Sequence, residues 1–110
     1  MKWFFISVAL AGAVAVSATA AELQEVRLTI REHRFDPAEI RVKAGHGVKL
    51  LILNADPAAE EFESPSLRKE KKILAGQTVE MSFPHLALGT YEFYGEFHPD
   101  SAKGKLVVEP

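Results

Sequence analysis

The sequence predicts an all-β protein, a β-sandwich of about seven to eight short strands. Three observations support this fold class. Apolar and polar residues alternate with period two over most of the chain after residue 25, segments rich in Gly, Pro, Asn and Asp interrupt the alternation, and no long segment has the spacing of an amphipathic helix. Alternating side chains point to opposite faces of a strand, so each strand is expected to bury one face against a second sheet.

The first half of the predicted sandwich contains its most apolar strand. Residues 26–31 alternate and predict a first strand, which Pro37 follows at a break, because proline has no N–H to donate to a ladder. The alternation resumes over residues 40–42 and ends in the turn 44–47, which contains two glycines. Residues 48–53 are more uniformly apolar, as is typical of a central strand covered on both faces.

The second half has shorter strands. Residues 60–64 follow a turn rich in Asn, Asp and Pro and predict a short strand or edge segment. Residues 65–72 are irregular, and Ser66 predicts the N-cap of a single helical turn there. The remaining strands are expected over residues 78–83, 91–94 and 105–108.

The N-terminal twenty residues have the pattern of a secretory signal peptide. Lys2 precedes an apolar stretch over residues 3–16, and small residues follow up to Ala20, after which cleavage is expected. The alternative is an uncleaved membrane anchor, but the apolar stretch is shorter than the roughly 20 residues that span a bilayer. We therefore predict a signal peptide over residues 1–20 and one domain over residues 21–110, exported and not membrane-spanning after cleavage.

The composition excludes several classes of function. The chain has 110 residues, a formal net charge of −2 and no basic stripe, so we expect a single core and no nucleic-acid partner. It contains no cysteine, which excludes a disulfide, a thiolate ligand and a thiol nucleophile. A nucleophile elbow, a glycine-rich phosphate loop and a zinc-helix motif are also absent from the sequence, so we predict no catalytic residues and no organic cofactor.

In their order, these segments resemble those of a cupredoxin. The matching segments are Phe35-x-Pro37 before Ile40-x-Val42, Ala44-Gly45 before an apolar strand that ends at Asn54, Ala75-Gly76-Gln77-Thr78, Gly89-Thr90-Tyr91-x-Phe93, and His98 followed by Gly104-x-Leu106-x-Val108. The resemblance covers nearly all of residues 21–110. It implies a cupredoxin-like Greek-key β-sandwich.

Three further segments resemble the cupredoxin-like domains of the EfeO type, which include small periplasmic proteins associated with ferrous iron uptake. The segments are Glu61-Phe62-Glu63-Ser64, Leu67-x-x-Glu70-Lys71 and Gly95-Glu96-Phe97-His98. This resemblance implies a periplasmic location. It also implies that the protein works beside another periplasmic metal-binding protein and an iron permease.

The blue-copper ligand set of cupredoxins is not retained. A type-1 blue copper site needs a cysteine thiolate, two histidines and usually a methionine. The resemblance places the cysteine position at Gly95, the methionine position at Ala102 and the upstream histidine position at Glu60 or Glu61, so only His98 remains. A metal bound here would meet carboxylate and imidazole donors, which suit iron, manganese, zinc or cupric copper.

The predicted metal ligands are Glu61, Glu96 and His98, with Glu63 and Glu60 as further candidates. Glu96 and His98 lie two residues apart and point to one side of an extended segment, and Glu61 and Glu63 are related in the same way. A one-residue shift of register would turn Glu60 towards the site in place of Glu61. The alternative is a solvated, ion-paired edge strand that binds no metal.

Five other residues are weaker candidates for the site or have a different expected role. His33 is expected either to add a ligand from the end of the sandwich or to be an exposed histidine. His46 and His85 lie in turns and are expected to be exposed, and Met81 belongs to an apolar alternation and to the core. Tyr94 is a candidate for a hydrogen bond to a ligand.

From the residues and the resemblance together, we expect a periplasmic protein that binds iron or copper and acts in iron acquisition. Whether it assists the oxidation of ferrous iron is left open. Two alternatives remain: a metal-free periplasmic interaction module and a copper-buffering protein.

Overall fold

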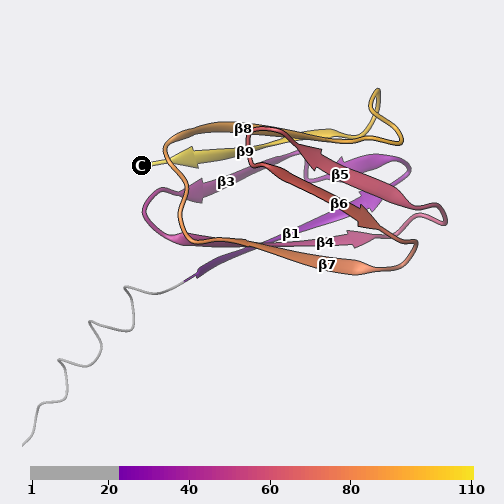
Figure 1. Ribbon diagram of the computed structural model, residues 1–110, viewed down its shortest axis with the longest axis horizontal. Helices are drawn as coiled ribbons and strands as arrows, with labels where there is room; N and C mark the ends of the chain where they lie inside the picture. Colours follow the sequence, from indigo (N-terminus) through magenta and orange to yellow (C-terminus); the bar gives the residue numbers. More distant parts are fainter. Residues whose placement is uncertain (1–22) are drawn as a thin grey trace, which may run out of the picture.

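The computed structural model describes residues 23–110, which form two β-sheets packed against each other (Figure 1). The predicted signal peptide, residues 1–20, lies outside the described residues. One sheet has the strand order β2-β1-β4-β7 and the other has the order β3-β9-β8-β5-β6. The strands are β1 (Leu23–Arg31), β2 (Arg34–Asp36), β3 (Glu39–Lys43), β4 (Gly47–Asn54), β5 (Glu60–Ser64), β6 (Lys69–Ile73), β7 (Thr78–Phe83), β8 (Gly89–Gly95) and β9 (Lys103–Glu109).

The predicted all-β class is confirmed, with nine strands in the described part of the chain where seven to eight were expected. The single helical turn predicted after Ser66 is not formed. The Ser64 hydroxyl instead accepts a hydrogen bond from the Leu67 amide at 3.3 Å, and Arg68 has a positive φ of 58°, so the chain turns tightly into β6. Within residues 23–110 there is no helix long and apolar enough to cross a membrane.

Both sheets contain parallel pairs between strands that do not follow each other in the sequence. β1 runs parallel to β4, from Leu23 opposite Gly47 to Ile30 opposite Asn54. β3 runs parallel to β9 in the other sheet, while the hairpin partners β8 and β9 are antiparallel. Each sheet is thus held together by a pairing between segments that are distant in the sequence.

The core lies between the sheets and contains the inward-facing residues of the alternating strands. Phe62 of β5 stacks on Phe93 of β8 with ring centroids 5.1 Å apart, and Phe35 of β2 meets Phe93 edge to face at 5.0 Å. Met81 is buried, as expected. The expectation that β4 is covered on both faces is wrong: Ile52 is fully buried but Leu53 is 37% exposed, because no element of residues 23–110 covers the outer face of this sheet.

Candidate metal centre

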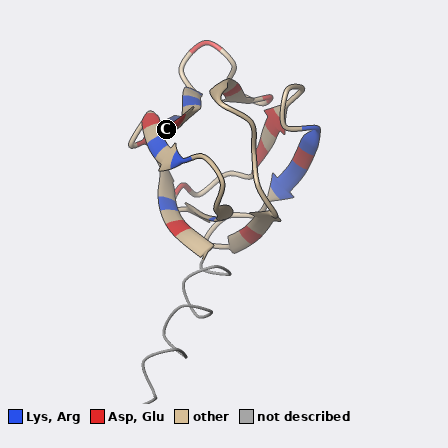
Figure 2. Ribbon diagram, turned by 90° about the vertical axis from the view of Figure 1, so that its left-hand side faces the viewer, with Lys and Arg blue, Asp and Glu red and all other residues tan. Residues whose placement is uncertain are grey.

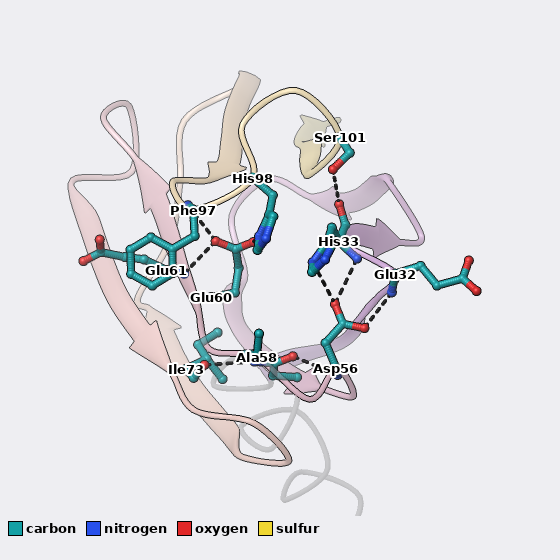
Figure 3. A network of polar contacts seen from close by, with 11 residues as sticks. Glu32, His33, Asp56, Ala58, Glu60, Glu61, Ile73, Phe97, His98 and Ser101 are labelled. Atoms are coloured by element: carbon teal, nitrogen blue, oxygen red, sulfur yellow. Dashed lines mark hydrogen bonds and ion pairs between the residues drawn. The ribbon is translucent and has the colours of Figure 1, made fainter.

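Three connections meet at one end of the sandwich and place the candidate site. They are the turn between β1 and β2, the connection from β4 to β5, and the loop of residues 96–102 between β8 and β9 (Figure 3). Figure 3 shows that Glu60 and Asp56 lie on the two sides of the paired rings of His33 and His98. Four titratable side chains from distant parts of the sequence thus form one polar network.

Glu60 is a buried carboxylate in this network. β5 alternates so that Glu60, Phe62 and Ser64 face the interior, and Glu60 is 1% exposed. Its Oε1 atom accepts hydrogen bonds from the amides of Glu61 and Phe97, both at 2.9 Å. Its Oε2 atom lies 2.6 Å from Nδ1 of His98. A carboxylate accepts such a hydrogen bond from the tautomer of His98 that carries its proton on Nδ1.

Gly95 leaves the space that the Glu60 carboxylate occupies. A Cβ atom at Gly95 would lie 2.6 Å from Cδ of Glu60 and 2.8 Å from both Oε2 of Glu60 and Cβ of Ala102. The positions that the cupredoxin pattern assigns to the copper ligands, namely Glu60, Gly95, His98 and Ala102, therefore do meet at one place. A type-1 blue copper ion does not fit them, because the thiolate is absent and a carboxylate fills its space.

His33 contributes the second ring of the network. Its imidazole stacks on that of His98 with ring centroids 3.6 Å apart and an interplanar angle of 14°. Its Nδ1 atom lies 3.5 Å from Oδ2 of Asp56. The His33 and His98 side chains are 44% and 29% exposed, so solvent and ions reach both rings.

Asp56 fixes the backbone that carries His33. Its carboxylate accepts hydrogen bonds from the amides of Glu32, at 2.6 Å, and His33, at 2.9 Å. Burial alone would raise the pKa of Asp56, but these two amide donors and the nearby histidines lower it overall. The buried Asn54 holds Asp56 in turn, since its side-chain oxygen accepts the Asp56 amide hydrogen at 3.0 Å.

The turn at residues 32–33 has an unfavourable backbone conformation. Glu32 and His33 have φ values of 55° and 58°, in the left-handed region that residues with a Cβ atom rarely adopt. Besides Asp56, the Ser101 hydroxyl stabilises this turn by donating to the His33 carbonyl at 2.7 Å. Sequence reasoning missed Asp56 and Ser101. The available signal is an aspartate two residues after Asn54 at a strand end, a pattern that also indicates a turn.

A second acidic group lies on the outer face of the same sheet. Glu61 and Glu63 of β5, Glu70 of β6 and Glu96 each offer a carboxylate oxygen, and these oxygens all lie within 4.8 Å of one another. Burial, the hydrogen bond with Glu96 and the charge of Glu70 raise the pKa of Glu63 to about 7. The pKa of the neighbouring Tyr94 is raised by burial and by the same carboxylates, and the structure records no hydrogen bond from its hydroxyl within residues 23–110.

The outer acidic group is not the ion-paired edge that was considered from the sequence. β6 is the edge strand and is largely basic, as its blue segments in Figure 2 show. Within residues 23–110, however, none of the four carboxylates forms an ion pair with a lysine or arginine. Lysines on an exposed edge also prevent pairing with other chains, a role that needs no contact with the carboxylates.

The predicted ligands are divided between the two places. Glu60 and His98 face the inner network, whereas Glu61, Glu63 and Glu96 belong to the outer group. Glu61, Glu96 and His98 are thus not brought together in the described part of the chain. The reason is that residues 96–97 form a turn, in which the His98 amide donates to the Gly95 carbonyl at 3.1 Å, so side chains two apart do not share a side. Of the two register alternatives, the structure has Glu60 facing inward.

Comparison with known proteins agrees with this fold. Residues 4–108 match the family described as cupredoxin-like domain, and the chain belongs to that family. An uncharacterized protein of Rickettsia prowazekii (strain Madrid E), RP394, is 38% identical over 84 residues, which cover 76% of this chain and 67% of that protein.

Two solved structures show the same fold at low identity. The metal-binding domain of the Cu(I)-exporting P-type ATPase CopA of Streptococcus pneumoniae D39, solved with Cu(I), has a TM-score of 0.69 and 20% identity, over 78% of this chain and 85% of that one. Auracyanin A, a blue copper protein of Chloroflexus aurantiacus, has a TM-score of 0.67 and 20% identity, over 79% of this chain and 99% of that one. At these identities the likeness concerns the fold alone.

Proposed function

We propose that this protein is an exported, periplasmic metal-binding protein that acts in iron acquisition, with its metal centre at the Glu60–His98 end of the sandwich. One observation carries the proposal: Glu60, Gly95, His98 and Ala102 meet at one place, and a buried carboxylate there orients a partly exposed imidazole. Keeping a carboxylate such as Glu60 buried costs free energy, so its pairing with His98 favours a functional role over an incidental contact.

The donor atoms support iron or cupric copper as the bound ion. Imidazole binds both metals, and carboxylate oxygens favour hard cations, whereas cuprous copper prefers sulfur ligands that this chain lacks at the site. The resemblance to the EfeO-type domains supports iron and supports a place beside a second periplasmic metal-binding protein and an iron permease. In that setting the protein would bind ferrous iron on its way to the permease or assist its oxidation.

Metal titration of residues 21–110 tests the proposal. Fe(II) without oxygen, Cu(II) and Zn(II) are added to the wild type, to His98→Ala and to His85→Ala, which removes a histidine of the β7–β8 connection, at the end of β8 away from the site. We expect micromolar or tighter binding of at least one metal, a loss of roughly tenfold or more in affinity for His98→Ala, and no change for His85→Ala. No intense blue colour is expected with Cu(II), because no thiolate is present.

The outcome also separates the alternatives. Absence of binding for every metal would contradict the proposal and favour a metal-free interaction module. Binding restricted to Cu(II) would favour copper buffering. If Glu63→Gln with Glu96→Gln abolished binding while His98→Ala did not, the outer acidic group would be the metal site.

A cellular experiment tests the role in iron acquisition and the location. A strain that lacks the gene should grow more slowly under iron limitation, and the wild-type gene should restore growth while the His98→Ala gene does not. Fractionation should find the protein in the periplasm. Normal growth of the deletion strain under iron limitation would contradict the assignment to iron.

A further inference from the structure

We propose that His33 is a second imidazole ligand of this centre, and that both histidines bind the metal through Nε2 while Glu60 and Asp56 hold their Nδ1 atoms. The inference rests on the proposed function and adds to it a ligand, the binding atoms and two positioning residues. The bound ion would be a divalent transition metal that accepts imidazole nitrogen, such as Cu(II), Zn(II) or Fe(II).

The first support is the pairing of each ring with its own carboxylate. Nδ1 of His98 lies 2.6 Å from Glu60, and Nδ1 of His33 lies 3.5 Å from Asp56. Within residues 23–110, no hydrogen bond to Nε2 of either ring is found. Histidines that bind metals almost always donate the other ring N–H to a carboxylate, a carbonyl or water, which fixes the tautomer and the ring orientation. His98 has that contact before any metal is bound, and Asp56 lies close enough to Nδ1 of His33 to accept its hydrogen bond when the His33 ring turns.

The second support is the way His33 is held. The turn that carries it has two consecutive non-glycine residues with positive φ, and such strain persists only where the surroundings stabilise it. Asp56 accepts both amide hydrogens of the turn and Ser101 donates to its carbonyl. These contacts come from segments 23 and 68 residues away in the sequence, and together they place the His33 ring over His98.

The third support is the position of the rings relative to each other and to solvent. The imidazoles are stacked at 3.6 Å and lie on connections of different sheets, so one ion bound to both would link the β1–β2 turn to the loop after β8. The lone pairs of two nearly parallel rings cannot point at one atom, so binding requires the rings to turn out of the stack. His33, which is 44% exposed, has room to turn.

The binding atoms are tested by nitrogen NMR of residues 21–110 labelled with ¹⁵N, before and after addition of Zn(II). In the metal-free protein we expect His98 as the tautomer with its proton on Nδ1. With Zn(II), the Nε2 resonances of both His33 and His98 should shift while the Nδ1 proton of His98 is retained. Loss of that proton would place the ion between Nδ1 and Glu60 and would overturn the inference.

The role of His33 is tested with His33→Asn, because asparagine tolerates the left-handed conformation better than most residues and so preserves the turn. We expect its Zn(II) affinity to fall roughly tenfold or more, with His46→Ala as the control that binds like the wild type. Asp56→Asn should weaken binding by about 10- to 100-fold and mix the two tautomers of His33 in the NMR spectrum.

The failures of the two proposals are distinguishable. If the wild type binds Zn(II) and His33→Asn binds it equally well, the role of His33 is refuted and the proposed metal centre stands on His98. If the wild type binds none of the metals tested, both proposals fail. Circular dichroism of each variant separates a lost ligand from a lost fold, and an unfolded His33→Asn would be replaced by His33→Gly, which also allows positive φ.

Discussion

At the centre of the site, the carboxylate of Glu60 occupies the space that Gly95 leaves open. A carboxylate can be buried there because the glycine opposite it has no side chain, and because two amides and an imidazole surround its oxygens. A glycine at position 95, where the cupredoxin pattern has its cysteine, is therefore spatially coupled to the inward-facing glutamate at position 60.

Gly95→Ala tests this coupling. Its Cβ atom would clash with Glu60, so we expect a loss of about 1–3 kcal/mol in the free energy of unfolding, measured by urea denaturation. In a Glu60→Ala background, the same substitution should cost less, because the clash with the carboxylate has gone and only the contact with Cβ of Ala102 remains. Equal costs in both backgrounds would show that Glu60 does not occupy this space.

Asp56→Asn tests the anchoring of the β1–β2 turn. Asparagine has one neutral carbonyl oxygen where aspartate has two charged oxygens, so it cannot offer each of the two backbone N–H groups its own charged acceptor. The free energy of unfolding should therefore fall by about 1–3 kcal/mol. The pKa of Asp56 is lowered in the folded state, so its contribution is present above its unfolded value of 3.8 and is lost as pH falls through the folded value. Stability measured from pH 2 to 6 should accordingly depend less on pH in the variant than in the wild type.

At the scale of the element, β5 separates two kinds of acidic site on its two faces. Glu60 faces inward to partners that satisfy it, whereas Glu61 and Glu63 face outward to other carboxylates. The inner face lowers the cost of one buried charge by hydrogen bonding. The outer face raises the free energy of several charges by bringing them together.

The outer group should make stability decrease as pH rises. The pKa of Glu63 is raised from 4.5 to about 7 in the folded protein, so the folded state holds a proton that the unfolded state releases. Its favourable contribution is fully present below pH 4.5 and is lost as pH rises through about 7. Thermal unfolding from pH 4 to 8 should show this decline, and Glu63→Gln should reduce it.

The matched control for this measurement is Glu80→Gln, a change at an exposed glutamate on β7, outside the acidic group. It should leave the pH profile as in the wild type. If stability rose between pH 5 and 7 in the wild type and in both variants alike, the repulsion within the acidic group would be contradicted.

At the scale of the whole molecule, three phenylalanines join the two sheets beneath the site. Phe35 comes from one sheet, and Phe62 and Phe93 come from the other, with ring centroids 5.0–6.1 Å apart. Phe93 also packs where a side chain at Gly104 would otherwise lie, with its Cε1 atom 2.5 Å from that Cβ position. Without a disulfide, this packing must stabilise the fold.

Phe93→Ala should therefore destabilise the whole molecule. Removal of a fully buried aromatic ring leaves a cavity and costs about 3–5 kcal/mol, measured as a lower urea midpoint with unchanged cooperativity. Phe97→Ala, at an exposed phenylalanine, is the control and should cost well under that amount. A small effect of Phe93→Ala would mean that the core collapses around the gap.

The fold was largely predictable because its signals are local. Period-two alternation identified the strands of residues 26–31 and 78–83, and an apolar run between turn residues identified the strand of residues 48–53, since these patterns depend only on neighbours in the chain. The helical turn after Ser66 was wrong because Ser64, an inward residue of the preceding strand, took part in a tight turn instead. The exposed face of β4 was also missed, since composition does not say which sheet face is left uncovered.

The site was only partly predictable. His98 and the absence of a thiolate follow from the sequence, but the choice of Glu60 over Glu61 depends on a register that a one-residue shift reverses. The sequence by itself determined the alternating strands, the absence of sulfur donors at the site and the supply of carboxylates and histidines. Only the tertiary structure decided which of them meet, because the contacts of Asp56 with His33 and of Glu60 with His98 join segments 23 and 38 residues apart through the pairing of strands in two sheets.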